Sequence, residues 1–413
     1  MLFRYLGQEY KWNKQKGFAQ FFLKYEVILS IEFYLLNLLK LDMNKSGLSL
    51  LTAALVFAAT SFAQDIAPKY SNEFLSIGVG ADALGMSNAV VAGVDDVTAG
   101  YWNPAGLTEV KDFLQIGAMH SEYFAGIAKY DYLGLAKPLD DKSTAGFTFI
   151  RFGVDDIPNT TQLIDASGNI DYDKITTFSA GDYAFLFSYA RKLPVKGLTG
   201  GANFKVVYRH VGDFARSWGF GLDAGLKYQL GEKWKFGALF RDVSSTFNAW
   251  SFSLDDQMIE TFQLTGNEIP QNGLEVTLPK IILGAQFKSK LFKELYVKTE
   301  LDLDLNTDGR RNVLIRTAPI SIDPHFGLAF GYGKWVTIRG GIGNFTFIKN
   351  SDLTESLTVQ PNIGIGVGFK GINIDYAFTD IGDASVALYS HVFSLRFKLS
   401  DPRSGDKKPS VDE

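Results

Sequence analysis

Long segments of strict alternation between apolar and polar residues constrain this sequence more than any other feature. From Leu295 to Leu305 the odd positions are apolar or threonine, whereas the even positions carry a tyrosine and four charged residues. The segments from Phe220 to Leu230 and from Tyr389 to Leu399 repeat this pattern. A period of two places successive side chains on opposite faces, so each segment is predicted to be a β-strand with one apolar face.

About fourteen such segments follow one another along the chain. They lie near 112–120, 126–137, 143–153, 181–193, 198–212, 217–230, 233–245, 278–289, 293–305, 323–332, 335–345, 357–370, 371–380 and 386–399. Many reach about ten residues, which exceeds the usual 5–6 of strands in globular proteins.

The connections between these segments alternate in length. Short turns are predicted at 138–142, 194–197, 231–232, 290–292 and 333–334, and long loops at 154–180, 246–277 and 306–322. Long loops at one end, short turns at the other and an even strand number are typical of an outer-membrane β-barrel, whose apolar face meets lipid. The strands of a soluble β-sandwich or propeller also alternate between apolar and polar residues. Such folds do not, however, alternate short turns with long loops. We therefore predict an all-β transmembrane outer-membrane barrel of about 14 antiparallel strands.

Composition restricts the function further. Aromatic residues make up 14% and charged residues 21%, which is too apolar for a disordered chain. The absence of cysteine excludes disulfide scaffolds, iron–sulfur proteins, zinc fingers and thiol catalysts. The four histidines do not lie at metal-ligand spacing, so no metal and no cofactor is expected. A net charge of −4 argues against nucleic acid as a partner.

The N-terminal region has the features of an export signal. Residues 46–64 carry no charge, their apolar core has the length of a signal-peptide h-region, and Ser61-Phe62-Ala63 resembles a cleavage site. We expect a signal peptide at 43–63 and export to the outer membrane. Residues 1–42 then precede the signal as an upstream, mis-called extension, with an amphipathic anchor helix as the alternative. The mature chain divides into a hatch segment (64–111), the barrel (112–399) and a polar periplasmic tail (400–413).

The hatch segment contains a sequence motif between Phe74 and Leu107. It is rich in small residues, lacks strict alternation and is predicted to form packed turns and short helix that fill the lumen. The residues that carry the motif are Gly78, Gly80, Gly85, Asp95, Asp96, Trp102, Asn103, Pro104 and Gly106. Pro104 also favours an extended conformation at Asn103.

This motif resembles the N-terminal signature of the PorV/PorQ-like outer-membrane proteins, which are FadL-type barrels. Ile374 to Phe378 also resembles the FadL-type pattern, whereas Gly106-Leu107 is closer to the general FadL form than to PorV. The resemblance implies a fourteen-strand barrel with a periplasmic N-terminus and an N-terminal hatch. It also implies a non-catalytic role in type IX secretion or surface export, with protein partners or cargo in addition to outer-membrane lipid.

Binding of a partner is expected at the long loops 154–180 and 246–277. The second loop holds five apolar residues that an exposed loop does not normally contain: Trp250, Phe252, Met258, Phe262 and Leu264. Folding of these residues over the barrel mouth is the alternative interpretation.

The chemical nature of the lumen distinguishes between two possible functions. Its inward-facing charges, including Glu300, Asp302 and Arg396, are expected to pair with one another, and an arginine at Asp302 should be tolerated better than one at outward-facing Leu301. A charged plug favours the protein-binding role, whereas a continuous apolar tunnel favours the alternative, FadL-like uptake of hydrophobic small molecules. An enzyme is not expected, because alternation places His391 on the opposite face from Ser390 and Ser394.

Overall fold

The computed structural model describes residues 71–163, 169–350, 352–379 and 389–401. They belong to one compact unit, Ala63–Glu413. The predicted extension (1–42), the predicted signal peptide (43–63) and the tail beyond residue 401 lie outside the described residues.

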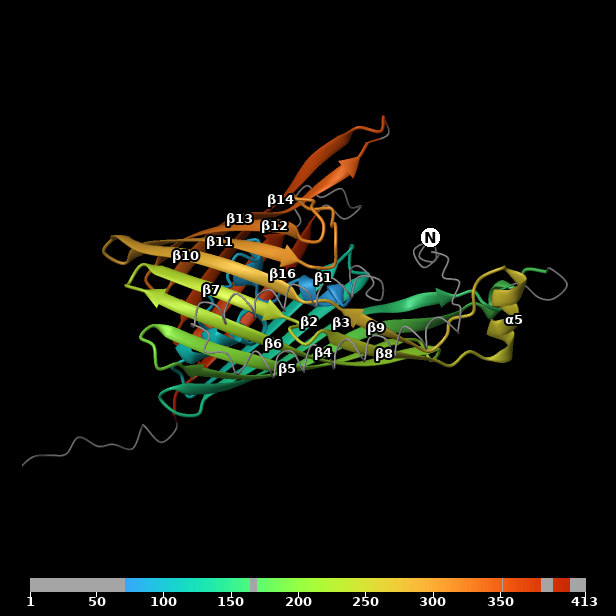
Figure 1. The fold of residues 1–413 in the computed structure, drawn as a ribbon, viewed down its shortest axis with the longest axis horizontal. Coiled ribbons are helices and arrows are strands. Elements are labelled where there is room, and N and C mark those ends of the chain that lie inside the picture. The colour runs from blue at the N-terminus through green and yellow to red at the C-terminus, as the bar shows by residue number, and fades with distance from the viewer. Residues whose placement is uncertain (1–70, 164–168, 351, 380–388, 402–413) are drawn as a thin grey trace, which may run out of the picture. The chain divides into compact units, whose positions relative to one another are not determined.

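The described chain is built almost entirely from antiparallel strands (Figure 1). They are β1 (Leu114–Tyr123), β2 (Ala128–Pro138), β3 (Ser143–Asn159), β4 (Thr176–Lys192), β5 (Leu198–Val211), β6 (Ala215–Leu230), β7 (Trp234–Arg241), β8 (Thr246–Phe252), β9 (Gly273–Thr277), β10 (Lys280–Phe292), β11 (Leu295–Asn306), β12 (Ser321–Tyr332), β13 (Val336–Lys349), β14 (Glu355–Phe369), β15 (Ile372–Thr379) and β16 (Ser390–Leu399).

Fourteen strand positions close into a barrel. Each strand pairs with the next along the ring, β1 pairs with β16, and β7 pairs with both β6 and β10. β8 and β9 are not further ring positions, because β8 continues the line of β7 along the outer half of β6, and β9 pairs with β8 alone among the described strands. The prediction of a barrel of about 14 antiparallel strands is confirmed.

Each of the fourteen predicted strand segments coincides with one strand of the ring, but two predicted long loops are wrong. β3 and β4 extend into 154–180 and leave only residues 160–175 between them, part of which forms η4 (Tyr172–Lys174). The segment 246–277 contains β8, β9 and helix α5 (Asp256–Leu264). Here backbone pairing between neighbouring strands continues beyond the segments whose side chains alternate.

Alternation assigns the two faces of the wall correctly. Outward-facing Phe220, Leu301 and Phe393 are 52%, 45% and 57% exposed, although they are large and apolar. The neighbouring inward-facing Asp302 is 1% exposed. A wall with apolar residues outside and polar residues inside is the pattern of an outer-membrane barrel.

Aromatic side chains gather on the outer wall towards both ends of the strands. Trp234 lies against Phe287 and Trp335 against Phe369 near the short turns, with ring centroids 4.9 and 6.1 Å apart. Towards the other end, Tyr208 and Trp218 lie 4.7 Å apart. Two such girdles bound the apolar band of membrane barrels at the lipid interfaces.

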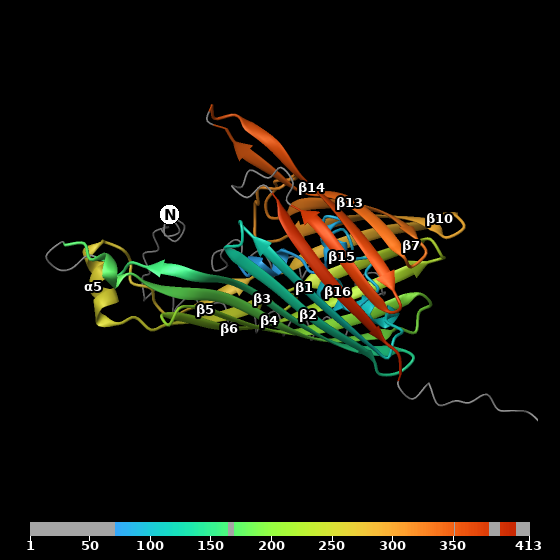
Figure 2. The ribbon, with the colours of Figure 1, turned by 180° about the vertical axis from the view of Figure 1, so that it is seen from behind.

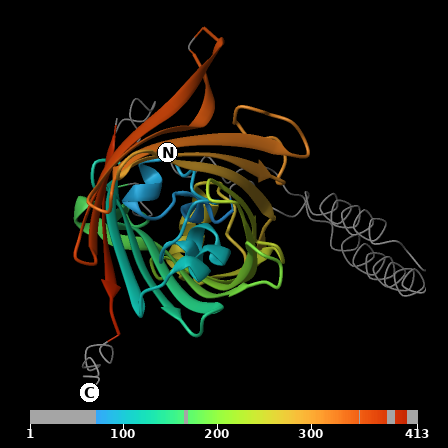
Figure 3. The same cartoon turned by 90° about the vertical axis from the view of Figure 1, so that its left-hand side faces the viewer.

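The hatch segment lies inside the ring of strands, as Figure 3 shows for its blue ribbon. Its elements are short helices of four to six residues: η2 (Glu73–Ser76), α3 (Ala81–Leu84), α4 (Ala99–Trp102) and η3 (Pro104–Glu109). Within the described residues, no helix has the length and apolarity needed to cross a membrane.

The strands extend unequally beyond the barrel at the end away from the short turns. β3, β4, β5 and β6 continue together with β8 and β9, and α5 lies at the far end of this group (Figures 1 and 2). We call β8, β9, α5 and the described residues 154–163 and 169–178 the outer extension. A second projection is formed by the outer halves of β13 and β14.

Candidate functional site

Two carboxylates on β11 hold the backbone of the hatch segment. Asp302 Oδ2 accepts hydrogen bonds from the N–H groups of Val90 and Val91 at 2.8 and 2.9 Å. Glu300 Oε1 accepts from the N–H groups of Ala92 and Gly93 at 2.7 and 2.9 Å. Both carboxylates are 1% exposed. Four hydrogen bonds to buried carboxylate oxygens therefore fix this loop of the hatch to β11.

Other inward-facing charges act in the same way. Arg241 donates to the carbonyls of Leu75 and Tyr101 at 2.8 and 3.2 Å. Lys227 donates to the carbonyl of Val94 and to Glu109. Arg396 forms ion pairs with two hatch carboxylates, Asp82 and Asp96.

The expectation that lumen charges pair with one another is confirmed for some of them, such as Lys205 with Asp223 and Arg209 with Asp182. Others, such as Arg241, Glu300 and Asp302, bind the backbone of the hatch instead. Alternation along a strand does not show what the hatch places against it. In the folded chain, the hatch presents backbone groups and carboxylates to the inner wall. Buried backbone groups need hydrogen-bond partners, and the charged side chains of the wall supply them.

Glycines in the wall allow the hatch backbone to approach closely. A Cβ at Gly201 would lie 2.5 Å from the carbonyl carbon of Pro104, and one at Gly237 would lie 2.5 Å from the carbonyl oxygen of Val91. The same holds for Gly341, whose Cβ would lie 2.4 Å from the carbonyl carbon of Met86. These inward positions lack side chains because the hatch occupies the space that a side chain would need.

The residues of the hatch motif make this packing possible. Asn103 is fully buried, and its Nδ2 donates to the carbonyls of Val91 and Leu226 at 3.0 and 3.1 Å, which joins two parts of the hatch to β6. Its Oδ1 accepts from the N–H of Ala105, and Pro104 begins η3. Trp102 Nε1 donates to the carbonyl of Val79 at 2.8 Å.

The motif glycines and aspartates have separate roles. Gly78 and Gly80 have φ of +102° and +87°, a backbone conformation that favours glycine. A Cβ at Gly85 would contact Gly364 of β14, and one at Gly106 would lie 2.5 Å from the carbonyl oxygen of Val94. Asp96 accepts from Thr98 and pairs with Arg396, whereas Asp95 is exposed at the edge of a cavity. Eight of the nine motif residues thus serve the packing of the hatch, and Asp95 is the exception.

One sector of the lumen is mainly apolar, although the uncharged polar side chains of Gln115, Thr148 and Ser188 are also buried there. Tyr130, Tyr132 and Ile150 on β2 and β3 are at most 3% exposed and belong to one cluster with Val97 and Leu107 of the hatch. The hydrogen bonds that cross this sector join uncharged groups, such as Tyr132 Oη to the Val97 carbonyl at 3.3 Å. We call this contact between the hatch and β1–β4 the apolar seam.

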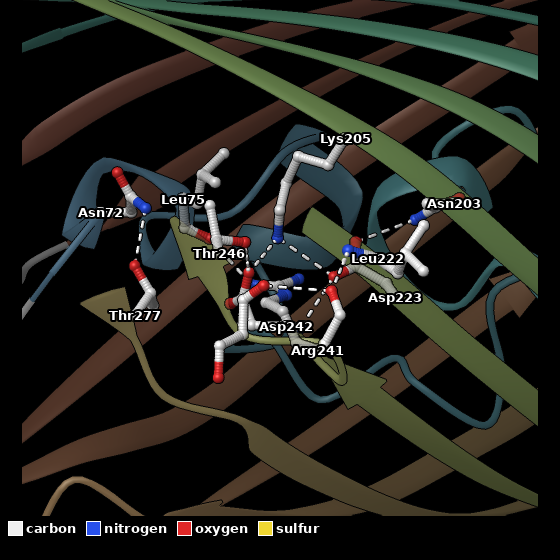
Figure 4. A network of polar contacts seen from close by, with 12 residues as sticks. Asn72, Leu75, Asn203, Lys205, Leu222, Asp223, Arg241, Asp242, Thr246 and Thr277 are labelled. Atoms are coloured by element: carbon white, nitrogen blue, oxygen red, sulfur yellow. Dashed lines mark hydrogen bonds and ion pairs between the residues drawn. The ribbon is translucent and has the colours of Figure 1, made fainter. Parts of the chain in front are cut away.

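The wall is interrupted between β7 and β8. Residues 242–245 leave the strand, Asp242 and Ser245 have positive φ, and Pro279 separates β9 from β10. Buried Lys205 bridges the interruption, since it pairs with Asp223 at 3.0 Å and with Asp242 (Figure 4). Asp223 also accepts from the N–H of Asp242 at 2.9 Å, so the network ties β5 and β6 to the end of β7.

The five predicted partner-binding residues belong to two different elements of the outer extension. Trp250 and Phe252 lie in β8, where Trp250 Nε1 donates to Glu275 at 2.6 Å and Arg209 stacks on its ring. Met258, Phe262 and Leu264 lie in α5, and only Leu264, at 76%, is largely exposed. Alternation of buried and exposed residues continues through β8, and it places Trp250 and Phe252 on the same face as buried Thr246 and Asn248.

The two serines considered with His391 lie on the opposite face of β16. His391 is on the outer wall, where its Nδ1 lies 2.7 Å from Tyr376 Oη, whereas Ser394 accepts from the N–H of Ala81 inside the lumen. The prediction that they share no proton is confirmed.

Comparisons with known proteins concern the fold. No protein-family model and no curated protein matches the sequence. Among solved structures, the chain is similar to the CymD monoaromatic hydrocarbon channel, with 14% identity and a TM-score of 0.49 over 79% of this chain and 98% of that chain. The Ralstonia pickettii toluene transporter TbuX gives 14% identity and 0.48, covering 78% and 98%. A Pseudomonas aeruginosa FadL homologue gives 10% and 0.43, covering 78% and 98%.

At this identity and TM-score, no substrate is transferred from these proteins to this chain.

Proposed function

We propose that this chain is a non-catalytic outer-membrane barrel that passes hydrophobic small molecules along the apolar seam. The observation that carries the proposal is the asymmetry of the lumen. The hatch is fixed by charged side chains of β6, β7, β11 and β16, and it meets β1–β4 through apolar packing.

The asymmetry determines where a passage would open. Apolar contacts are non-directional, so an apolar molecule can replace them. The hydrogen bonds that would be lost across the seam join uncharged groups, such as the N–H of Val97 and Gln115 Oε1 at 3.1 Å. Separation on the charged side would instead expose buried N–H and C=O groups, which costs about 1–3 kcal/mol for each unsatisfied group. A hydrophobic molecule would therefore pass between the hatch and β1–β4. The outward apolar band and the aromatic girdles support placement in the outer membrane.

Disulfide locks test the route in a chain that has no native cysteine. Val97→Cys with Gly117→Cys crosses the apolar seam, since a Cβ at Gly117 would lie 2.7 Å from Val97 Cγ1. Ala92→Cys with Gly284→Cys is the matched lock on the charged side, where the two Cβ positions are 3.3 Å apart. We expect the oxidised seam lock to abolish uptake of a labelled long-chain fatty acid, with recovery on reduction, and the matched lock to retain uptake. Uptake that persists through the oxidised seam lock would refute this route.

A second candidate function is binding of a protein partner or cargo in type IX secretion or surface export, as the PorV/PorQ-like resemblance implies. The outer extension supports it, because Tyr172 and Leu264 are 70% and 76% exposed and Leu274 is 56% exposed. Apolar groups in such positions are common in protein interfaces.

Replacing 256–264 by a Gly-Ser linker of equal length separates the two functions. The linker removes α5 and leaves the pairing of β8 with β9 in place. A deletion of 250–268 would instead remove part of β8 and disturb that pairing. Loss of surface proteins with unchanged fatty-acid uptake would favour the partner role. An unchanged surface proteome would count against it.

A further inference from the structure

A large cavity lies at the end of the barrel opposite the outer extension. Its volume is about 1010 Å³, and it is bounded by the hatch, by the inner faces of β10, β11, β13 and β16, and by the turns after β12 and β14. Because those turns and the end of β16 line it, the cavity opens at the short-turn end of the barrel. The cavity is separate from the apolar seam, and a role for it would be additional to the proposed function.

The cavity is lined by more cationic than acidic side chains. The cations are Lys235, Lys288, Lys298, Lys334, Arg339, Lys370, Arg396 and Lys398, and the acids are Asp82, Asp95, Asp96, Asp112 and Glu294. Three of the cations have carboxylate partners: Arg339 binds Asp375, Arg396 binds the hatch carboxylates, and Lys235 binds Glu109.

Five cations remain without such a partner. Among the described residues, no carboxylate oxygen lies within 4.0 Å of the ammonium groups of Lys288, Lys298, Lys334, Lys370 and Lys398. Two of them contact aromatic rings instead: Lys288 lies 4.7 Å from the Tyr296 ring centroid and Lys370 lies 5.2 Å from that of Phe369. Asp95, Asp112 and Glu294 of the lining have no cation within 4.0 Å either among the described residues, so the five lysines exceed the unpaired carboxylates by two. A concave surface with an excess of positive charge attracts anions more strongly than a flat one does.

The arrangement of these lysines indicates the form of the ligand. They come from five places, namely β10, β11, the turns after β12 and β14, and β16, so they surround the cavity rather than converge on one point. The carboxylates Asp82, Asp95 and Asp96 belong to the hatch, whereas Lys334, Lys370 and Lys398 lie at or next to the strand ends. A small anion would meet few of the lysines at once, whereas an extended chain with several carboxylates can meet lysines on several elements.

We propose that this cavity binds an acidic peptide segment of a protein on the short-turn side of the membrane. Lys334, Lys370 and Lys398 bind its carboxylates at the mouth, and Lys288 and Lys298 bind those that enter. Glu294 in the turn after β10 opposes the peptide.

The test uses the full chain in nanodiscs of zwitterionic lipid and a short fluorescein-labelled Glu/Gly peptide, with fluorescence anisotropy as the readout. The variant Lys334→Gln/Lys370→Gln/Lys398→Gln should bind the peptide at least tenfold more weakly. The matched control Lys142→Gln/Lys196→Gln/Lys233→Gln removes the same charge from other short turns that do not line the cavity, and it should retain binding. Glu294→Gln should bind more tightly, because it removes a like charge.

Three outcomes would overturn the proposal. Equal weakening in the two triple variants would show general attraction to a basic surface. Binding that Glu294→Gln leaves unchanged or weakens would place the peptide elsewhere. Citrate or inorganic phosphate can be added at a concentration equal to that of the carboxylate groups in the peptide. Displacement of the peptide under this condition would show a site for a small anion.

Discussion

At the scale of single residues, the inner wall is shaped to the hatch. Small residues stand where the hatch backbone comes close, and acidic residues stand where it presents N–H groups. Asp302 illustrates the second case. An arginine there is expected to cost less than one at Leu301 because the lumen is polar, but Asp302 is buried against the hatch backbone rather than facing water, so that reason does not hold at this position.

The first prediction concerns two adjacent glycines on β5. Gly201→Ala should displace the hatch, since its Cβ would lie 2.5 and 2.6 Å from backbone atoms of Pro104 and Ala105. Gly200→Ala should be tolerated, because the nearest atom to its Cβ is a Leu193 methyl carbon at 3.4 Å. Hydrogen exchange of residues 104–107 measures the difference. Equal exchange in the two variants would mean that the hatch does not rest on this position.

The second prediction concerns the carboxylate of Asp302. Asp302→Ala leaves the N–H groups of Val90 and Val91 without their acceptor, at about 1–3 kcal/mol each. Exchange of these two amides should accelerate while the strands stay protected. Asp182→Ala removes a carboxylate that binds Arg209 at 2.8 Å and should leave them unchanged. Unaltered protection in Asp302→Ala would contradict the anchoring role.

At the scale of elements, each strand works as a two-faced unit, and its outer face is adapted to lipid. Leu301→Arg should destabilise the barrel by about 2–4 kcal/mol if Leu301 lies near the midplane of the bilayer. Leu291→Arg, beside the turn before β11, should cost less because it lies towards the interface. Denaturant unfolding in lipid vesicles measures both changes. A cost at Leu291 as large as that at Leu301 would argue against a lipid-facing wall.

At the scale of the whole barrel, the outer extension and the short turns lie at opposite ends of the strands (Figures 1 and 2). We expect the extension outside the cell and the turns in the periplasm, because long connections of such barrels are extracellular. An impermeant thiol reagent should label Leu264→Cys in intact cells and leave Lys196→Cys unlabelled. Labelling of Lys196→Cys alone would reverse the orientation.

The sequence by itself determined the barrel, because a period of two is a property of each strand and needs no knowledge of its neighbours. The alternation from Leu295 to Leu305 was sufficient to place Leu301 outside and Asp302 inside. It could not show what Asp302 binds, because the N–H groups of Val90 and Val91 are more than two hundred residues away in the chain. Contacts between the hatch and the wall depend on how the ring closes, so only the tertiary structure decided which lumen residues hold the hatch and which side remains apolar.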